Sequence, residues 1–164
     1  MIVAQHAVEG LPPSNAAASI AEKLEIGERG APRWITIHFG AAMEAAKLLE
    51  ELETHGVIGS RTSVQGGGSC LGVMGPDGAM IGAGDGVGVF AVWDDLGDYG
   101  TACVDFGTDP QAAGARAALE AVERAGRQGE APDLFWVTAT PGCEEAIIAG
   151  IEEATGGGTP ILGG

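Results

Sequence analysis

Basic residues are scarce in this chain of 164 residues. Eight Lys and Arg stand against 23 Asp and Glu, which gives a formal net charge of −15. Nucleic-acid binding draws much of its affinity from Lys and Arg that neutralise phosphates, and anionic membranes attract the same side chains. The composition therefore argues against nucleic acids and membranes as partners.

Cysteine pairs, long apolar runs and a secretion signal are also lacking. The three cysteines are far apart and form neither a CxxC pair nor a zinc-type spacing, which is typical of reduced thiols inside the cell. No apolar run approaches the ~18 residues of a membrane helix. The first ten residues have neither a basic n-region nor an apolar h-region. We therefore expect a cytoplasmic protein; the sequence indicates no metal site and specifies no cofactor.

Glycine, by contrast, is abundant. The chain has 29 glycines, whereas a typical usage of ~7% would give about 11. They follow no triplet period and accompany ordinary amounts of Val, Ile and Leu. They therefore predict turns and close backbone approaches rather than a collagen or a linker.

The residue pattern predicts an α/β fold, a mixed sheet with strand–helix units at both ends and a central antiparallel meander, flanked by helices. Residues 1–32 are expected to form a helical lead-in, and residues 33–164 an α/β domain. This domain is either complete in itself or one half of a longer or two-chain protein. A Pro-Asp-Gly turn predicts a hairpin within 70–84. The other predicted elements are helices at 14–25, 41–56, 108–126 and 141–156, and strands at 33–39, 57–59, 86–93, 99–106, 133–139 and 159–162.

The two ends of the chain resemble each other. Segments 35–60 and 135–164 share a strand, a loop, a helix with adjacent acids, a glycine and a short apolar strand. Ligands of open α/β sheets often bind where such strand ends splay. This echo directs attention to the loop GSRTSVQGGGSCLG at 59–72, which follows the first of these strands.

Arg61 is the centre of the candidate site in this loop. It is the only Lys or Arg between residues 48 and 115, a stretch with ten Asp and Glu. A guanidinium beside hydroxyls and glycine N–H groups can cradle a carboxylate or a phosphate. The alternative is a surface arginine paired with a neighbouring acid. The candidate ligand-binding residues are Arg61, Thr62, Ser63, Gly66, Gly67 and Ser69, with Thr138, Thr140, Gly163 and Gly164 on the other side.

The thiols offer a weaker hypothesis. Thr140 is expected to cap a helix that begins at Pro141, which would place Cys143 in its first turn, where the helix dipole lowers a thiol pKa. Glu144 and Glu145 oppose a thiolate there, and no histidine is near in sequence. A structural cysteine is the favoured interpretation, and we assign no catalytic residue.

Several stretches follow one another in the order of a known family: GVIGSRTS, GPDGAMI, GVGVFAVWDDLGDYGTACVDFG, DPQAAGARAALEAV, APDLFWVTATPGCEEAIIAGI and TPILGG. Over about residues 33–164 the chain resembles the N-terminal FIST domain of bacterial signal-transduction proteins. The resemblance implies a sensory module with a small ligand, for which amino acids are proposed, and some relatives resemble haem-binding sensors. It also implies a partner, either a C-terminal FIST domain or a second chain.

We therefore expect a cytoplasmic sensory module that binds a small anionic metabolite, such as an amino acid, and relays it to a signalling partner. Arg61 would take the carboxylate and an acidic residue the ammonium. Two alternatives stay open. One is an enzyme of hydrolase or amidase type, assembled with a second chain after self-cleavage beyond Gly164. The other is a structural half that buries an open strand edge against a partner.

Overall fold

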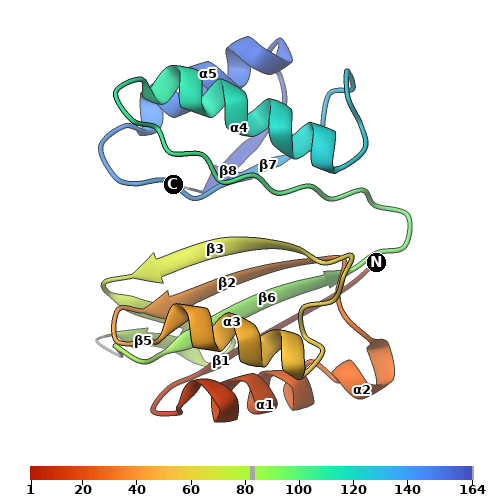
Figure 1. Cartoon of the computed structure of the whole chain (residues 1–164), viewed down its shortest axis with the longest axis vertical. Helices are drawn as coiled ribbons and strands as arrows, with labels where there is room; N and C mark the ends of the chain where they lie inside the picture. Colours follow the sequence, from red (N-terminus) through yellow and green to blue (C-terminus); the bar gives the residue numbers. More distant parts are fainter. Residues whose placement is uncertain (82–83, 164) are drawn as a thin grey trace. The chain divides into compact units, whose positions relative to one another are not determined.

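The computed structural model describes residues 1–81 and 84–163 (Figure 1). The chain divides into two compact units, Met1–Gly97 (unit 1) and Asp98–Gly164 (unit 2). Both units combine helices with strands, and the sheet of unit 1 is mixed, which confirms the predicted α/β class. No helix among the described residues is long and apolar enough to span a bilayer.

Unit 1 is built on a four-stranded sheet with the order β1-β6-β2-β3. β6 is antiparallel to both of its neighbours, β1 and β2, whereas β3 is parallel to β2. A separate hairpin, β4 with β5, has the predicted Pro-Asp-Gly turn. The elements are β1 (Ile2–Val8), α1 (Pro13–Lys23), α2 (Ile26–Arg29), β2 (Trp34–Gly40), α3 (Ala45–Thr54), β3 (Ser63–Ser69), β4 (Gly72–Gly75), β5 (Gly78–Ile81) and β6 (Val87–Trp93).

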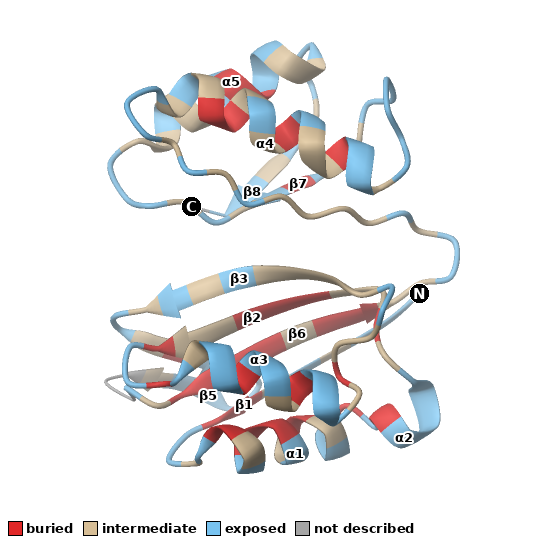
Figure 2. Cartoon of the chain, in the orientation of Figure 1, coloured by how far each residue is buried: buried red, intermediate tan, exposed pale blue. Residues whose placement is uncertain are grey.

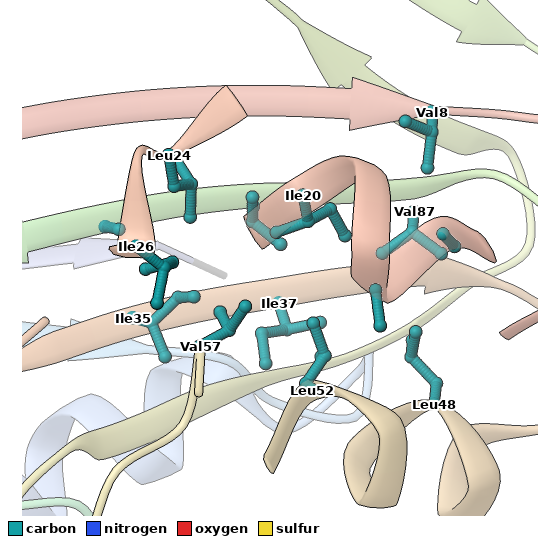
Figure 3. Packing of buried hydrophobic residues seen from close by; sticks show 14 of the residues in the cluster. Val8, Ile20, Leu24, Ile26, Ile35, Ile37, Leu48, Leu52, Val57 and Val87 are labelled. Atoms are coloured by element: carbon teal, nitrogen blue, oxygen red, sulfur yellow. The ribbon is translucent and has the colours of Figure 1, made fainter. Parts of the chain in front are cut away.

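The core of unit 1 lies between the sheet and helices α1 and α3 (Figure 3). Alternate residues of a strand point to opposite faces, so Ile35 and Ile37 of β2 share the face that meets Ile20, Leu48 and Leu52 of the helices. All five side chains are buried to within 2%. Burial of each contributes roughly 1.5–3 kcal/mol, which fixes this face of the sheet against the helices.

Unit 2 is smaller and begins with an irregular segment, residues 99–106, which we call the arm. Helix α4 (Pro110–Arg124) follows, and its N-cap Asp109 accepts a hydrogen bond from the N–H of Ala112 (3.0 Å), as the Asp-Pro pair predicts. Two short parallel strands, β7 (Phe135–Val137) and β8 (Ile161–Gly163), flank α5 (Glu144–Thr155) in sequence. A small core of Ala118, Val122, Phe135 and Ile151 joins the helices to the strands.

Two sequence predictions of strands are wrong, and the strand β1 was not predicted. Residues 57–59 are a turn after α3, and the strand comes later, at 63–69, in the stretch expected to be a loop. Residues 99–106 pair with no described strand. Residues 1–32, expected to be a helical lead-in, contain β1, an edge strand of the main sheet.

The start of α5 also differs from the prediction. The helix begins at Glu144, and its N-cap is Cys143, whose side chain makes no capping bond. Thr140 therefore lies before the helix and does not cap it. Glu144 instead accepts a hydrogen bond from the N–H of Gly142 (2.8 Å), and this bond is the first cause of a lowered Glu144 pKa.

The two units repeat one arrangement in atomic detail. In unit 1 the Thr62 hydroxyl, just before β3, donates to the carbonyl of Pro32, just before β2 (2.7 Å). In unit 2 the Thr159 hydroxyl, just before β8, donates to the carbonyl of Pro132, just before β7 (3.2 Å). We call this bond the Thr–Pro clamp. It joins the entrances of two neighbouring parallel strands in both units.

The paired strands match as well. Gly66 of β3 lies opposite Ile37 of β2, and Gly163 of β8 lies opposite Val137 of β7. Both glycines have positive φ, +142° and +110°. A Cβ on either would stand within 2 Å of the partner's carbonyl oxygen, so only glycine fits.

The helices between these strands end alike. The N–H of Val57 donates to the carbonyl of Leu52 after α3, and the N–H of Gly157 donates to the carbonyl of Glu152 after α5, both at 2.9 Å. This bond spans the C-terminal turn of a helix and satisfies a carbonyl that the helix leaves open. The predicted echo of 35–60 and 135–164 is therefore a structural repeat, strand–helix–strand, although the second strand of unit 1 comes later than predicted.

Candidate functional site

A pocket of about 330 Å³ lies in unit 1, at the end of the sheet where β2 and β3 begin and β6 ends. Ligands of open parallel sheets usually bind at the opposite, carboxyl end of the strands. The pocket gathers three of the six arginines of the chain. Its lining residues are Arg29, Gly30, Ala31, Pro32, Arg33, Gly59, Ser60, Arg61, Thr62, Trp93, Asp94 and Asp95.

Strand pairing brings distant parts of the sequence to this pocket. The N–H of Arg33 donates to the carbonyl of Val92 (2.8 Å), and the N–H of Ser63 donates to the carbonyl of Arg33 (2.9 Å). The Thr62 hydroxyl also accepts from the N–H of Gly59 (3.0 Å) while it donates to Pro32 in the clamp. These bonds hold residues 59–62 beside residues 32–33, so Arg33 and Arg61 line the same hollow.

Trp93 closes another side of the pocket. Its indole Nε1–H donates to the carbonyl of Gly30 (2.9 Å), and the Arg29 guanidinium lies over its ring at 5.6 Å from the centroid. Arg29 also pairs with Glu25, whose Oε2 accepts from Nε at 2.8 Å. A cation over an indole face and a carboxylate partner both restrict the side chain. Arg29 is therefore positioned before any ligand arrives.

Arg33 and Arg61 keep donors available for an anion. The Nε–H of Arg33 is buried and has no hydrogen-bond partner in the described part of the chain. Arg61 is exposed and forms no ion pair with any described residue. A buried donor without an acceptor costs about 1–3 kcal/mol. Asp94 and Asp95 at the rim could meet a positive group of the same ligand.

Unit 2 shows that the fold itself does not require these arginines. Its clamp lacks all three: 100 residues after Arg29 and Arg33 stand Gly129 and Asp133, and Gly158 precedes the clamp Thr159 as Arg61 precedes Thr62. The same backbone arrangement thus forms without an arginine at any of these three positions. The clamp of unit 1 therefore does not depend on these arginines.

The three arginines of unit 2 are engaged in holding unit 2 together. Arg116 donates to the carbonyl of Asp105 (3.3 Å) and Arg124 to that of Thr101 (2.7 Å). Arg127 donates from Nε to Asp98 Oδ2 (2.8 Å), and this hydrogen bond and the Asp98 charge raise the Arg127 pKa. The available guanidinium groups therefore lie in unit 1.

The predicted ligand residues in the glycine-rich stretch separate along a strand. Arg61 and Thr62 line the pocket, although the Thr62 hydroxyl serves the clamp. Ser63 begins β3, and Ser69 ends it roughly 20 Å away at ~3.3 Å per residue. Gly66, Gly67 and Ser69 therefore do not converge on Arg61, because the expected loop is an extended strand.

The remaining predicted residues belong to unit 2. Thr138 and Thr140 are exposed and follow β7, and Gly163 ends β8. Gly163 pairs with Val137. Gly164 lies outside the described residues. The pocket of unit 1 is lined by none of these four.

The sequence analysis missed Arg29, Arg33 and Trp93. Arg29 and Arg33 precede Arg61 by 32 and 28 residues, Trp93 follows it by 32, and strand pairing brings these segments together. One sequence signal was available: Ala-Pro occurs at 31–32 and again at 131–132, each before a strand, with Arg following the first and Asp the second. Comparison of these two sites would have marked Arg33 as distinctive.

The other chemical groups form no second centre. Cys70 and Cys103 are exposed and Cys143 is half-buried, all as free thiols. Within residues 1–81 and 84–163, no group of three or more His, Cys, Asp or Glu side chains could hold a metal ion. Among known proteins, no family model and no curated sequence matches this chain.

Proposed function

We propose that this protein is a cytoplasmic sensory module that binds a small anionic metabolite in the pocket formed by Arg29, Arg33 and Arg61. One observation carries the proposal. A chain with a net charge of −15 gathers half of its arginines around one pocket, and the equivalent position of unit 2 has none. Guanidinium groups suit carboxylates and phosphates because they donate two parallel hydrogen bonds.

An amino acid fits the charges of the pocket. Arg33 and Arg61 would take the carboxylate, and Asp95, exposed at the rim, would take the ammonium. The sensory role and the relay to a signalling partner come from the resemblance of residues 33–164 to N-terminal FIST domains. The pocket itself supports the binding of an anion.

Titration calorimetry with succinate and with inorganic phosphate tests the site, since the two probes distinguish a carboxylate from a phosphate. Arg61→Ala removes a charge-assisted pair worth about 1.5–3 kcal/mol, so we expect affinity to fall about 10- to 100-fold. Lys47→Ala, on the exposed face of α3, removes the same charge away from the pocket and should leave affinity unchanged.

Equal losses in the two variants would mean that only net charge matters, and the proposed pocket would be wrong. Binding of neither probe to the unchanged protein would also contradict the proposal. Hydrolysis of a small amide by the purified protein, lost in Cys143→Ala, would favour the enzyme alternative instead.

A further inference from the structure

Unit 2 repeats the element order of unit 1, but none of its described strands corresponds to β6. Unit 1 runs β1, α1, β2, α3, β3, and then reaches β6 through the β4–β5 hairpin. Unit 2 runs arm, α4, β7, α5, β8. The arm occupies the place of β1 in this order, since each precedes the first long helix of its unit. In unit 1, β6 lies between β1 and β2 and pairs with both.

The arm has the geometry of a strand without a partner strand. Its Thr101 and Asp105 carbonyls accept from Arg124 and Arg116 of α4. Eight residues of helix rise about 12 Å, and four residues of extended chain span about 13 Å. The arm is therefore extended as it runs along α4 (Figure 1).

The second half of the arm, residues 102–106, alternates in burial with the two-residue period of a strand, whereas residues 99–101 are all half-buried. Ala102, Val104 and Phe106 are half-buried, whereas Cys103 and Asp105 between them are exposed. Gly100 fits closely against α4, because a Cβ there would stand 1.9 Å from the Ala121 carbonyl oxygen. The sequence prediction of a strand at 99–106 thus identified strand-like residues, and what they lack is a neighbouring strand among the described residues.

The sheet of unit 2 is also smaller than parallel sheets normally are. It consists of two parallel strands of three residues each. Parallel strands normally lie inside larger sheets, and an isolated two-stranded sheet is marginal in water. Leu162, on the face opposite to the core residue Ile161, is 53% exposed. One more strand beside β7 would make a sheet of the size that unit 1 has.

We propose that unit 2 accepts one further β-strand between the arm and β7, antiparallel to both, and that a segment joined after residue 164 supplies it. Unit 1 provides the pattern, because β6 follows β3 in the same chain and enters between β1 and β2. The incoming strand should be apolar and uncharged on its helix-facing side, like Val87, Val89 and Ala91 of β6, since a charge there would be buried without a partner.

The experiment extends the chain with its own strand. A copy of residues 68–97, placed after Gly164, reproduces the spacing of unit 1, because Gly66 and Gly163 are equivalent. The matched control carries Val89→Asp and Ala91→Asp in the appended copy only. Amide hydrogen exchange is then followed by mass spectrometry in peptides that cover 99–106 and 133–139, with β2 of unit 1, which the extension does not duplicate, as the internal reference.

We expect exchange in both unit 2 peptides to slow by at least about tenfold with the unaltered extension and to stay unchanged with the control. Equal slowing by both extensions, or by neither, would overturn the proposal. Hydrogen exchange of the chain of 164 residues, without any extension, tests the proposal independently. Exchange of the arm and β7 as slow as that of β2 would mean that no strand is missing. Slowing that depends on protein concentration would assign the site to a second copy and would also overturn it.

Discussion

Units 1 and 2 share a strand–helix–strand arrangement but differ in what surrounds it. Both have the Thr–Pro clamp, a glycine of positive φ paired with a residue of the neighbouring parallel strand, and the same bond after the helix. Unit 1 adds β1 and β6 to its two parallel strands, and unit 2 adds the arm. The shared features are what the arrangement needs in order to fold, and the features of one unit alone call for another explanation.

The arginines belong to the second group. Arg29, Arg33 and Arg61 surround the clamp of unit 1, whereas Gly129 and Asp133 mark that region of unit 2. The Thr62 hydroxyl serves the clamp, which both units share, whereas Arg33 and Arg61 have no arginine counterpart in unit 2. From the sequence alone, Thr62 and Arg61 had been placed together as ligand residues.

Burial differs between the units in the same direction as sheet size. Among the described residues, all of the largest fully buried side chains belong to unit 1 (Figure 2). The core residues of unit 2 retain 3% to 9% exposure. Unit 1 should therefore be the more stable of the two in the chain of 164 residues.

The largest expected effect is on the two strand glycines. Gly66→Ala should lower the free energy of unfolding of unit 1 by at least about 3 kcal/mol, because the new Cβ would overlap the Ile37 carbonyl. Gly163→Ala should act in the same way on unit 2 alone. Hydrogen exchange resolved by unit measures each loss.

Gly78→Ala is the matched control for the glycines. Gly78 also has a positive φ, +126°, but a Cβ there meets nothing within 4 Å. Gly78→Ala should lower the free energy of unfolding by about 1–2 kcal/mol, from backbone strain alone. A loss as large for Gly78→Ala as for Gly66→Ala would contradict the close approach of β3 to β2.

The Thr–Pro clamp should contribute less to the free energy of unfolding than the two strand glycines, and its contribution should differ between the two units. Thr62→Val removes a hydroxyl that donates at 2.7 Å and accepts at 3.0 Å, so we expect a loss of about 1–2 kcal/mol in unit 1. Thr159→Val removes one bond of 3.2 Å and should cost less in unit 2. Exchange rates under native conditions report both values, and the reverse order would show that the two clamps are not equivalent.

Acid should destabilise unit 1 more than unit 2, although this effect should be smaller than those above. Burial lowers the pKa of His38, and burial together with the Lys23 charge lowers that of His6 although Asp77 opposes the shift. The folded state therefore disfavours the protonated rings. The stability of unit 1 should be complete above the unfolded histidine pKa and fall as pH drops through about 6.5 toward 5.

All three histidines lie in unit 1, so unit 2 should keep its exchange protection over that pH range, after correction for the intrinsic pH dependence of exchange. His38→Gln should reduce the dependence in unit 1. An equal loss in both units would assign the effect to groups other than the histidines.

Local signals predicted much of the fold. The alternation of 33–39, the helix formers of α3, the Pro-Asp-Gly turn and the Asp-Pro cap of α4 each lie within a few residues and gave elements that the structure contains. β3 was missed because glycine and serine are poor strand formers, and Val64 is its only β-branched residue. The pairing of β3 with β2, which places Gly66 opposite Ile37, compensates for that composition. Such a register is a property of the whole sheet.

The candidate site was predicted in part for the same reason. Arg61 stood out because it is isolated among acids in the sequence. Arg33 reaches it through pairing of β2 with β3, and Trp93 through pairing of β6 with β2. Contacts of this range follow from tertiary structure, and the only sequence signal for them was the repeated Ala-Pro before Arg33 and Asp133.

The most direct test of the central claim gives unit 1 the residues of unit 2. Arg33→Asp with Arg61→Gly reproduces Asp133 and Gly158 around an intact Thr–Pro clamp. Calorimetry with succinate and phosphate, paired with thermal unfolding, is the measurement. We expect that binding of both probes is lost while the unfolding temperature stays within a few degrees of that of the unchanged protein. Unchanged binding would contradict the assignment of the arginines to function, and collapse of the fold with binding would show that they serve structure after all.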